Sequence, residues 1–489
     1  MEVREGFYVD GSWRGSTGDE TFTVVNPYTE EPFGQAAIST ADDVDVATRS
    51  AHRALHEGPW RDTSLDDRIA IVERIRDLVR DRADELARIT TSSMGTPYHG
   101  YRNLANSIEI IDMSIDMIRK VQWEYLRMDD TGDTLVVRRP VGVVAGIVPW
   151  NVPVRSEIKK VIPSLLAGCT IVLKPSPEAP LGAALFAEMC SEAGVPDGVF
   201  NLVPGDGTTG DHLVRHPLVR KVAFTGSSAT GTRIWTAVAE RFTHLQLELG
   251  GKSAAILLDD VDLKRAIPGL NAGIFYLSGQ QCTATSRILA PRSRYEEVVD
   301  AMSEAAQLLV PGDPFEASTT LGPLVAERQR TRVLDYVDIG KAEGARLVTG
   351  GRRPPGQSSG WFVEPTVFAD VDNSMRIAQE EIFGPVVVVI PYEGEDEAIR
   401  IANNSEYGLG GAVYSSDPHR SLAVARQIDS GYISINRYGI ASSAPFGGVK
   451  RSGIGREHGV EGYDSFLEYV SHPLPHKFAE ELAKTVTLN

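Results

Sequence analysis

The chain has 489 residues, of which 42% are apolar and 24% charged, and its formal net charge is −17. This composition is typical of globular proteins and excludes a disordered or collagen-like chain, and at roughly 100–200 residues per domain the length predicts several domains. The acidic balance argues against a nucleic-acid partner, because phosphate contacts need clustered Lys and Arg.

Membrane and secretory signals are not recognisable in the sequence. No apolar run reaches the roughly 20 residues of a membrane-spanning helix, and the opening MEVREGFYVDGSW lacks the apolar stretch of a signal peptide. Three cysteines, Cys169, Cys190 and Cys282, are too few and odd in number for a disulfide framework. We therefore expect a soluble protein of a reducing compartment, the cytoplasm, with no membrane partner.

The central part of the chain alternates β-rich runs with helical patterns. The unbroken apolar run VGVVAGIV at 141–148 predicts a strand buried on both faces. Repeated strand–helix units predict right-handed crossovers and a parallel sheet covered by helices on both faces. The further expected elements are a helix at 156–167, a strand at 169–174, a helix at 181–193, strands at 199–203 and 221–225, and a helix from 228.

A second series of α/β units begins near residue 253 and runs to about residue 440. Its first elements are a strand at 253–258, a helix at 263–278 and a strand at 287–291. Two segments fit neither series. Residues 123–140 carry the turn-like DDTGD between β-patterned flanks and predict a hairpin, and the tail after 463 ends in a charged, helix-like stretch.

Cys282 is the first candidate for chemistry. It follows a predicted helix in SGQQCTATSR and is flanked by Gln281 and Thr283 rather than by apolar residues. Reactive thiols lie in polar, accessible surroundings. Cys169, in a predicted core strand, and Cys190, on an apolar helix face, are typical of structural thiols, and a structural thiol is the alternative for Cys282 too.

Glu248, in HLQLELGGKS, and Asn151, in VPWNVP, both lie at the ends of predicted strands. A carboxylate at a buried sheet edge is costly unless it is paired or functional, and burial can tune it to activate water. An amide held between two prolines at a strand end is suited to stabilising an oxyanion, because ligand crevices of α/β sheets lie there. A salt-bridge partner and an ordinary turn residue are the respective alternatives.

The segment FTGSSATG, at 224–231, stands between a predicted strand and a helix. Glycines there allow a phosphate to approach, and the helix N-terminus offers free N–H donors. The pattern departs from G-x-G-x-x-G, so alone it is a weak dinucleotide signal. Lys174, at the end of an earlier strand in LKPSPEAP, is placed either to reach a ribose hydroxyl or to remain in solvent.

Over roughly residues 20–475 the chain resembles the NAD(P)-dependent aldehyde dehydrogenase superfamily. The motifs that carry the resemblance, in order, are PWNVP, LKPSP, AGVPDGVFNLVPGDG, FTGS-x-x-x-G, LELGGK, GQQC, QEEIFGPV and PFGGVKRSGIGRE. The separation between Glu248 and Cys282 is also similar to that of the family. The resemblance implies an α/β fold with a Rossmann-like cofactor-binding domain, an α/β catalytic domain and a small β oligomerisation arm.

The resemblance also implies roles for the candidate residues. Cys282 resembles the nucleophile that forms a thiohemiacetal with the aldehyde, and Asn151 with the Cys282 backbone N–H would hold its oxyanion. After hydride transfer to the nicotinamide, Glu248 would activate the water that hydrolyses the thioester to the acid. Lys160 matches a lysine near the catalytic centre that is associated with proton transfer.

The implied cofactor is NAD, with NADP as the alternative. Many NAD-preferring relatives have a glutamate where Pro177 stands here, with Glu178 next to it, whereas no second Arg or Lys adjoins Lys174 to bind a 2′-phosphate. No metal site is expected. The positions that match the family's cofactor contacts are Trp150, Lys174, Ser176, Gly226, Ser227, Glu381 and Phe383.

The implied substrate is a small-molecule aldehyde. The positions that match the family's substrate tunnel are Val152, Arg155, Tyr276, Gln281, Thr283, Tyr438, Ile440 and Phe446. They are mostly apolar and aromatic, which favours a hydrophobic or aromatic aldehyde. Arg155 could instead face an acidic substrate, although a solvated arginine at a helix start is the simpler interpretation.

Three competing functions follow from the same residues. A CoA-acylating semialdehyde dehydrogenase passes the acyl group to CoA, but such enzymes typically lack the base that Glu248 supplies. A cysteine hydrolase would need a histidine within reach of Cys282, and no His-containing motif surrounds the thiol. A non-catalytic homologue would not be expected to retain Cys282, Glu248 and Asn151 together.

The resemblance finally implies a domain division and a homo-oligomer. Residues 1–122 with 142–250 would bind NAD(P), residues 251–440 would form the catalytic domain, and 123–141 with 441–489 would form the oligomerisation arm and C-terminal segment. A projecting hairpin is marginal without a partner. We therefore expect a homodimer or homotetramer.

Overall fold

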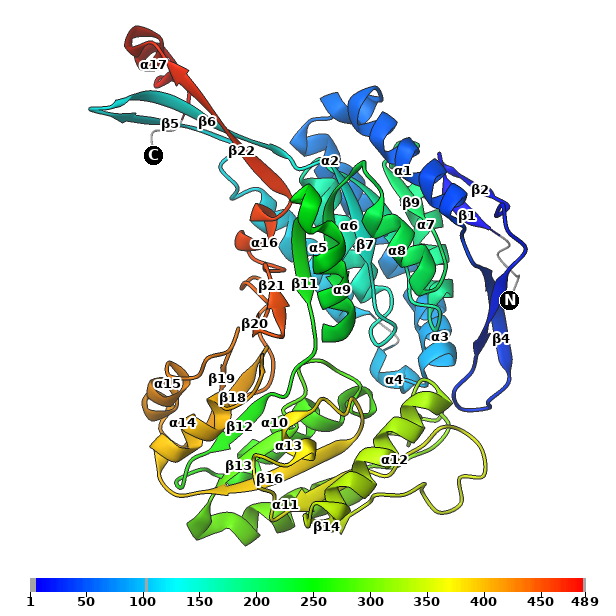
Figure 1. Cartoon of the computed structure of the whole chain (residues 1–489), viewed down its shortest axis with the longest axis vertical. Coiled ribbons are helices and arrows are strands. Elements are labelled where there is room, and N and C mark those ends of the chain that lie inside the picture. Colours follow the sequence, from blue (N-terminus) through cyan, green and yellow to red (C-terminus); the bar gives the residue numbers. More distant parts are fainter. Residues whose placement is uncertain (1–5, 102–103, 487–489) are drawn as a thin grey trace.

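The computed structural model describes residues 6–101 and 104–486. Figure 1 shows two α/β bodies, one above the other, and an arm of strands that projects from the upper body. The arrangement of sheets confirms the expected architecture, a Rossmann-like α/β part with a second α/β part and a small β arm.

The upper body is built on an eight-stranded sheet whose central strands are parallel. In spatial order its strands are β2 (Ser12–Arg14), β1 (Phe7–Val9), β9 (Phe200–Leu202), β8 (Thr170–Lys174), β7 (Val143–Ile147), β10 (Val219–Thr225), β11 (His244–Glu248) and β21 (Gly453–Ile454). β7 and β8 are buried along their whole length, because helices cover both faces of the sheet. The strands expected at 141–148, 169–174, 199–203 and 221–225 are confirmed.

Helices pack on the two faces of this sheet in two layers. The side chains on one face join a core with α1, α8 and α9, and those on the other face join a core with α2, α3, α5, α6 and α7. The bounds are α1 (Ala41–His56), α2 (Leu65–Asp81), α3 (Ala83–Met94), α4 (Tyr98–Tyr101), α5 (Ala105–Ile118), α6 (Arg155–Leu166), α7 (Pro180–Glu192), α8 (Gly207–Arg215) and α9 (Ser228–Val238), with the 3₁₀ turns η1 (Pro59–Asp62) and η2 (Ala239–Arg241).

The lower body contains a seven-stranded sheet. Its strands, in order, are β14 (Arg346–Thr349), β15 (Thr366–Ala369), β16 (Val386–Tyr392), β13 (Arg287–Pro291), β12 (Ala254–Leu257), β18 (Gly411–Tyr414) and β19 (Ser434–Ile435). Alternate residues of β12 face two separate cores, one with α10 and α11 and the other with α12, α13, α14 and α15. The helices are α10 (Leu263–Phe275), α11 (Tyr295–Gln307), α12 (Glu327–Ala342), α13 (Arg376–Gln379), α14 (Glu395–Asn403) and α15 (Pro418–Ala425), with η3 (Tyr276–Gly279) and η4 (Arg292–Arg294).

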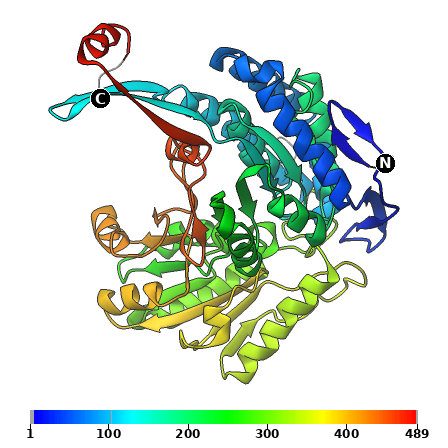
Figure 2. The same cartoon turned by 45° about the horizontal axis from the view of Figure 1, so that its top comes forward.

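The arm is a three-stranded antiparallel sheet of β22 (Leu467–Leu474), β6 (Gly132–Pro140) and β5 (Glu124–Asp129). β5 and β6 confirm the expected hairpin, and β22 pairs with β6 along its whole length. Figure 2 shows the arm reaching out from the body, with α17 (His476–Leu482) at its far end. The remaining elements are the pairs β3 (Thr21–Val25) with β4 (Pro32–Ala37) and β17 (Tyr407–Gly408) with β20 (Val449–Lys450), and α16 (Glu461–Asp464).

One predicted element differs from the structure. The helix expected at 263–278 ends at Phe275, and η3 follows it. Leu277 and Ser278 adopt left-handed φ angles of 53° and 55°. Non-glycine residues rarely adopt this conformation, so the apolar pattern of the sequence gave no sign of the turn.

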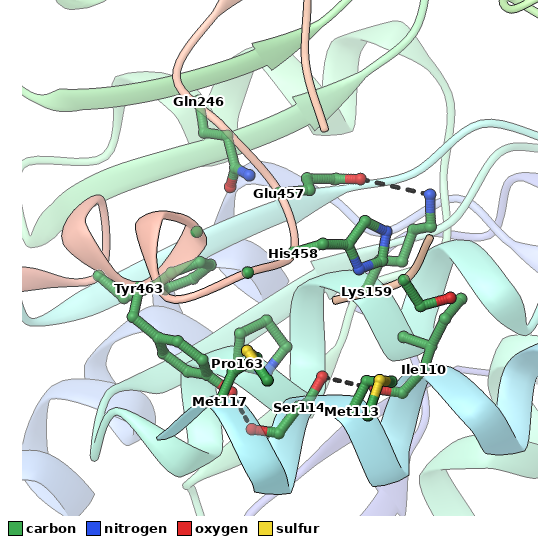
Figure 3. A pocket seen from close by; sticks show the side chains of 14 residues that line it. Ile110, Met113, Ser114, Met117, Lys159, Pro163, Gln246, Glu457, His458 and Tyr463 are labelled. Atoms are coloured by element: carbon green, nitrogen blue, oxygen red, sulfur yellow. Dashed lines mark hydrogen bonds and ion pairs between the residues drawn. The ribbon is translucent and has the colours of Figure 1, made fainter. Parts of the chain in front are cut away.

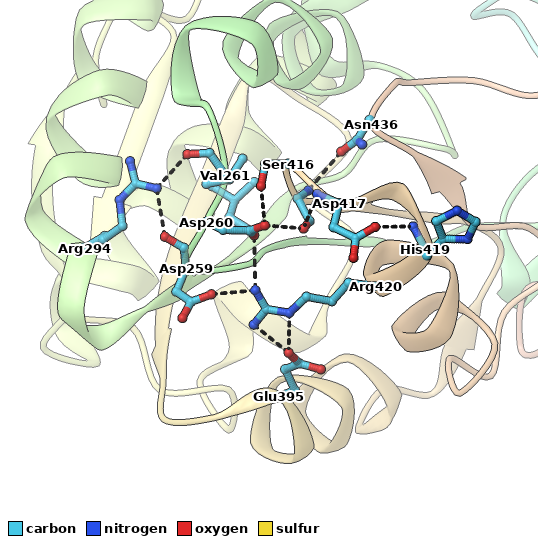
Figure 4. A network of polar contacts seen from close by, with 12 residues as sticks. Asp259, Asp260, Val261, Arg294, Glu395, Ser416, Asp417, His419, Arg420 and Asn436 are labelled. Atoms are coloured by element: carbon cyan, nitrogen blue, oxygen red, sulfur yellow. Dashed lines mark hydrogen bonds and ion pairs between the residues drawn. The ribbon is translucent and has the colours of Figure 1, made fainter.

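A polar network at the edge of the lower body joins its helices to the sheet (Figure 4). The Arg420 guanidinium of α15 contacts Asp259 at 2.7 Å, Asp260 at 3.3 Å and Glu395 of α14 at 2.6 Å. The hydroxyls of Ser415 and Ser416 donate to Asp260. A single ion pair on a solvated surface contributes little to stability. Here, however, one arginine joins α14, α15 and the loop after β12, and so holds these three segments together.

Candidate active site

Cys282 lies in the loop that follows η3, between the two bodies of the fold. The left-handed residues Leu277 and Ser278 reverse the chain direction after α10. A Cβ at Gly279 would lie 2.1 Å from the carbonyl oxygen of Gly384, so only glycine fits this crossing of backbones. The turn removes Cys282 from the helix, and the residue is left half-buried.

The LELGGK segment at the end of β11 packs directly on this loop. A Cβ at Gly251 would lie only 2.4 Å from the Cys282 carbonyl oxygen. On the other side, the Gly226 N–H donates to the carbonyl of Glu248 at 3.0 Å. Glu248 therefore lies on a short stretch of chain that contacts both the cysteine loop and the glycine turn after β10.

The Glu248 side chain is almost fully buried, with 2% exposure. Neither of its carboxyl oxygens has a hydrogen-bond partner among the described residues. Burial and the nearby charge of Glu457 raise the pKa of Glu248 well above its ordinary value. A buried carboxyl without a partner is costly to a fold, so its presence points to a chemical role.

The surroundings of Cys282 favour the protonated form of its thiol. Burial first, and then the carboxylate of Glu381, raise its pKa to about 12, whereas the Lys159 ammonium lowers it. The thiol therefore needs a proton acceptor before it can act as a nucleophile. By contrast, Cys169 and Cys190 are buried in the upper core, as predicted for structural thiols.

Asn151 follows β7 and is buried. Its side-chain N–H donates to the backbone carbonyl of Gln280 at 2.9 Å, which fixes the amide beside the cysteine loop. The amide has a second N–H, and this one is the donor that an oxyanion could use.

Lys160 of α6 is buried and donates to Glu457, and Lys159 lies 3.4 Å from the other oxygen of the same carboxylate. Although burial alone would raise it, the two lysines hold the pKa of Glu457 well below its ordinary value. Glu457 was not among the predicted site residues, although it ends the GIGRE motif. Its pairing with α6 joins distant parts of the chain, and no local pattern indicates it.

The predicted cofactor residues Trp150, Lys174, Gly226 and Ser227 lie at the carboxyl ends of the adjacent strands β7, β8 and β10. Ser227 caps α9 and accepts from the Thr230 N–H at 3.2 Å. Lys174 is 5% exposed, and burial lowers its pKa to about 8, so the interpretation of a solvated lysine is wrong. This edge of the sheet is where open α/β folds bind nucleotides.

Glu178 has partners that the sequence did not reveal. The Ser176 hydroxyl donates to one of its carboxylate oxygens, and the Arg328 guanidinium of α12 donates to the other. No second basic residue adjoins Lys174 in the sequence. In the fold, however, Arg328 binds Glu178, which lies four residues after Lys174. The two bodies thus meet beside the lysine.

Glu381 and Phe383 lie on the loop before β16, in the lower body. Glu381 accepts from the Gly251 N–H at 3.0 Å, and burial raises its pKa to about 7. Phe383 has a φ of 64°, and its ring meets that of Trp150 edge-on with centroids 5.4 Å apart. The loop before β16 therefore contacts the LELGGK segment and the residue that follows β7.

Three of the predicted tunnel residues, Gln281, Thr283 and Tyr438, contact one another beside Cys282. The Tyr438 hydroxyl is 2.7 Å from Thr283 Oγ1 and donates to Gln281 Oε1 at 2.9 Å, so it bridges the two neighbours of Cys282. Tyr276 and Arg155 line a cavity of about 180 Å³. Phe446 is buried, and Val152 and Ile440 are half-buried.

Two negative findings apply to residues 6–101 and 104–486. There, no cluster of three or more His, Cys, Asp or Glu side chains could hold a metal ion. In the same segments, no helix has both the length and the apolar character needed to cross a membrane.

Known proteins match the chain along nearly its whole length. Residues 13–471 match the sequence model of the aldehyde dehydrogenase family. A geranial dehydrogenase of Castellaniella defragrans is 44% identical over 467 residues, which cover 95% of this chain and 97% of the relative. A 3-succinoylsemialdehyde-pyridine dehydrogenase of a Pseudomonas species is 43% identical and covers 94% of this chain and 97% of its own.

Solved structures agree with the sequence comparison. A Mycobacterium tuberculosis aldehyde dehydrogenase complexed with NAD⁺ superposes with a TM-score of 0.95 and 43% identity, covering 97% of this chain and 98% of its own. A Bacillus cereus aldehyde dehydrogenase in its NAD⁺ complex gives a TM-score of 0.94 with 38% identity, covering 97% of each chain.

Proposed function

The chain belongs to the aldehyde dehydrogenase family, and on that premise we propose that it oxidises an aldehyde to a carboxylic acid, with Cys282 as nucleophile and NAD as hydride acceptor. The proposed substrate is a hydrophobic or aromatic aldehyde. The observation that carries the proposal is the packing of the Glu248 segment on the cysteine loop, where Gly251 leaves no room for a side chain.

The residues at the carboxyl ends of β7, β8 and β10 fit a dinucleotide. A Cβ at Gly226 would lie 2.4 Å from the Phe224 ring, so only glycine fits in the turn before α9. Without a side chain there, a phosphate can approach the backbone of the turn. Lys174 Nζ donates to the Pro175 carbonyl at 3.0 Å and has further N–H donors for ribose oxygens. The N-terminus of α9 would face the pyrophosphate, and Glu381 would accept from the nicotinamide ribose.

The first proposed chemical step takes place on Cys282. The thiol gives its proton to solvent water, and the sulfur of the resulting thiolate attacks the aldehyde carbon, so that a C–S bond forms and the π electron pair of the carbonyl moves to oxygen. The second N–H of Asn151 and the backbone N–H of Cys282 would donate to that oxyanion. When bound, NAD supplies the acceptor for the hydride that leaves this adduct, and a thioester remains on the sulfur.

The second step is hydrolysis of the thioester. Glu248 would take a proton from water while the hydroxide attacks the acyl carbon, and the C–S bond then breaks to return the thiolate and release the acid. The Glu457 carboxylate raises the pKa of Glu248 and the Lys160 ammonium lowers it, so the pair would set how readily the buried carboxyl takes up and releases this proton.

Two alternatives are disfavoured by the same geometry. A CoA-acylating enzyme does not need a buried carboxyl beside the thioester, whereas Glu248 is kept here at a cost to the fold. A cysteine hydrolase would need an imidazolium near the thiol. The His458 ring packs edge-on against that of Phe446 with centroids 6.3 Å apart, and burial followed by the Lys159 charge lowers its pKa to about 3, which disfavours the imidazolium.

One assay tests the proposed function directly. Purified protein is mixed with NAD or NADP and a panel of aliphatic and aromatic aldehydes, with and without CoA, and NADH or NADPH formation is followed by absorbance. We expect reduced cofactor without CoA. Strict dependence on CoA would favour the acylating alternative, and no hydride transfer with any aldehyde would overturn the proposal.

Cofactor choice can be tested at Glu178. Its carboxylate would repel a 2′-phosphate and also binds Arg328. In Glu178→Gln the repulsion is lost and Arg328 is released, so we expect the ratio of kcat/KM for NADP to that for NAD to rise about tenfold or more. The measurement is steady-state kinetics with both cofactors.

The matched control for this prediction is the double variant Glu178→Gln with Arg328→Gln. It removes the cation that would bind the phosphate, and the ratio should fall back. An unchanged cofactor ratio in Glu178→Gln itself would show that the carboxylate does not face the ribose.

The domain division and the assembly state complete the proposal. We assign residues 1–122 and 142–250 to cofactor binding, 251–440 to the catalytic domain, and 123–141 with 441–489 to the arm and C-terminal segment. Exposed aromatic side chains support self-association, with Tyr469 on the arm 51% exposed and Trp235 on α9 49% exposed. Size-exclusion chromatography with light scattering should give a dimer or tetramer.

A further inference from the structure

A small cavity in the lower body is lined by two cationic residues, Lys252 and Arg287. Lys252 lies just before β12, and Arg287 is the first residue of β13, which pairs with β12. Both side chains are only 2% exposed. The cavity measures about 20 Å³, and Ser253 and residues 407–410 also line it. Two positive charges are therefore buried around one internal space.

The Lys252 ammonium has no hydrogen-bond partner within the described part of the chain. Other buried lysines have a partner that offsets their charge. Figure 3 shows Lys159 reaching the Glu457 carboxylate, at 3.4 Å, and Lys221 Nζ lies 4.3 Å from the centre of the Phe466 ring. A buried charge without a partner is costly, so Lys252 is the exception that needs an explanation.

The Arg287 guanidinium is held by neutral oxygens. Its N–H groups donate to the Lys252 carbonyl and Asn373 Oδ1 at 2.9 Å, and to the carbonyls of Ile401 and Ala402 at 3.0 Å. These contacts use four of the five donors of an arginine, and none of them brings a negative charge. Although burial lowers its pKa to about 10, the guanidinium remains charged at neutral pH.

The acidic side chains that act on Lys252 have partners of their own. Glu381 accepts from the Gly251 N–H at 3.0 Å, and an arginine of α13 binds Glu380 at 2.8 Å. Burial, followed by the charge of Arg287, lowers the pKa of Lys252 to about 7, and the two carboxyls oppose this less strongly. Loss of the Lys252 proton would still leave the Arg287 charge without a counter-charge.

A second polar atom without a partner belongs to the lining of the same cavity. Ser253 is 4% exposed, and its hydroxyl makes no hydrogen bond among residues 6–101 and 104–486. An ammonium and a hydroxyl are both donors that suit an anion. The cavity exceeds the roughly 10–15 Å³ that one water molecule needs, so a monatomic ion fits, whereas a phosphate or a carboxylate is too large. A water molecule would leave both charges uncompensated.

We propose that Lys252, Ser253 and Arg287 hold one monatomic anion, chloride, inside the lower body. The anion accepts from the Lys252 ammonium and the Ser253 hydroxyl, and its charge offsets that of the guanidinium. Because Arg287 also binds carbonyls of α14, the bound ion stabilises the junction of β12, β13 and this helix. The site is independent of aldehyde oxidation, so it stands or fails separately from the proposed function.

Thermal unfolding of the full-length protein in sodium chloride and in sodium gluconate, at equal ionic strength, tests the site. Gluconate is too large for the cavity. An ion that binds only the folded state raises the melting temperature, and we expect a value about 2 °C or more higher in chloride. Lys252→Met should lose this difference. In Ser253→Ala, the chloride concentration needed for the same rise should increase about 3- to 10-fold, because one hydrogen bond is lost.

Lys264→Met is the matched control for Lys252→Met. Lys264 is exposed on α10 of the same body, so its replacement should leave the chloride effect unchanged. Each variant is compared with itself in the two salts, so a general loss of stability does not affect the result. If Lys252→Met fails to fold, Ser253→Ala and diffraction from the wild type decide.

Wild-type crystals soaked in sodium bromide provide the direct readout. Bromide replaces chloride and scatters X-rays anomalously, so we expect an anomalous peak in the cavity beside Lys252 Nζ and Ser253 Oγ. The site is refuted if bromide does not enter the cavity, if the wild type melts alike in both salts, or if Lys252→Met retains the full chloride effect.

Discussion

Replacing Cys282 with alanine is expected to lower kcat/KM for every aldehyde on the order of 10⁴-fold or more. Without the sulfur no thiohemiacetal forms, so no adduct is present from which a hydride can leave. Cofactor binding should persist, because its proposed residues lie on other strand ends. The measurement is NADH formation, combined with NAD binding by fluorescence or calorimetry.

Cys190→Ala is the matched control for this loss. It removes a thiol that is buried in the upper core, and it should retain activity. Burial raises the pKa of the Cys282 thiol to about 12, so alkylation of the wild type should become faster as the pH rises. Undiminished turnover in Cys282→Ala would remove the basis of the mechanism.

Replacing Glu248 with glutamine should separate the two halves of the reaction. Thioester formation does not require the base, so we expect a burst of NADH close to one per subunit. The following steady state should be slower by about 10²–10⁴-fold, because no group accepts the proton of water. Stopped-flow absorbance and mass spectrometry of the acylated protein measure the two phases.

The pH profile gives a second readout for Glu248. Burial and Glu457 raise its pKa, so the base form increases as the pH rises through that value, and wild-type turnover should increase with it. Glu248→Gln should lack this increase. Glu327→Gln, on the exposed start of α12, should leave both the burst and the profile unaltered; a Glu248→Gln variant that turns over normally would falsify the role of the base.

Most of the α/β order could be predicted from the sequence, because it depends on local patterns. The all-apolar run of β7 and the DDTGD turn of the hairpin each carry their own signal. The motif residues Cys282, Glu248 and Asn151 could be proposed as one site because parallel strands end at a common edge. Their assignment to chemistry still awaits the experiments above.

The features that the sequence did not predict depend on contacts between residues far apart in the chain. Glu457 binds Lys160, and Arg328 binds Glu178, across large separations in sequence, so neither pairing has a local pattern. The burial of Lys174 results from the packing of neighbouring strands and helices, and cannot be judged from LKPSP alone. The turn at Leu277 and Ser278 is held by tertiary contacts against the local preference for φ below zero.

The pairing of β11 with β21 has a consequence for how the protein folds. Leu247 and Glu248 pair with Ile454 and Gly453, from a segment that is synthesised much later than β11. Until that segment emerges, the strand that carries Glu248 is an open sheet edge, a place where nascent chains can pair wrongly. Contacts of such long range are formed slowly. The proposed catalytic centre therefore cannot be complete until β21 has formed, and a chain cut short before β21 would lack the edge strand beside Glu248 as well as the arm.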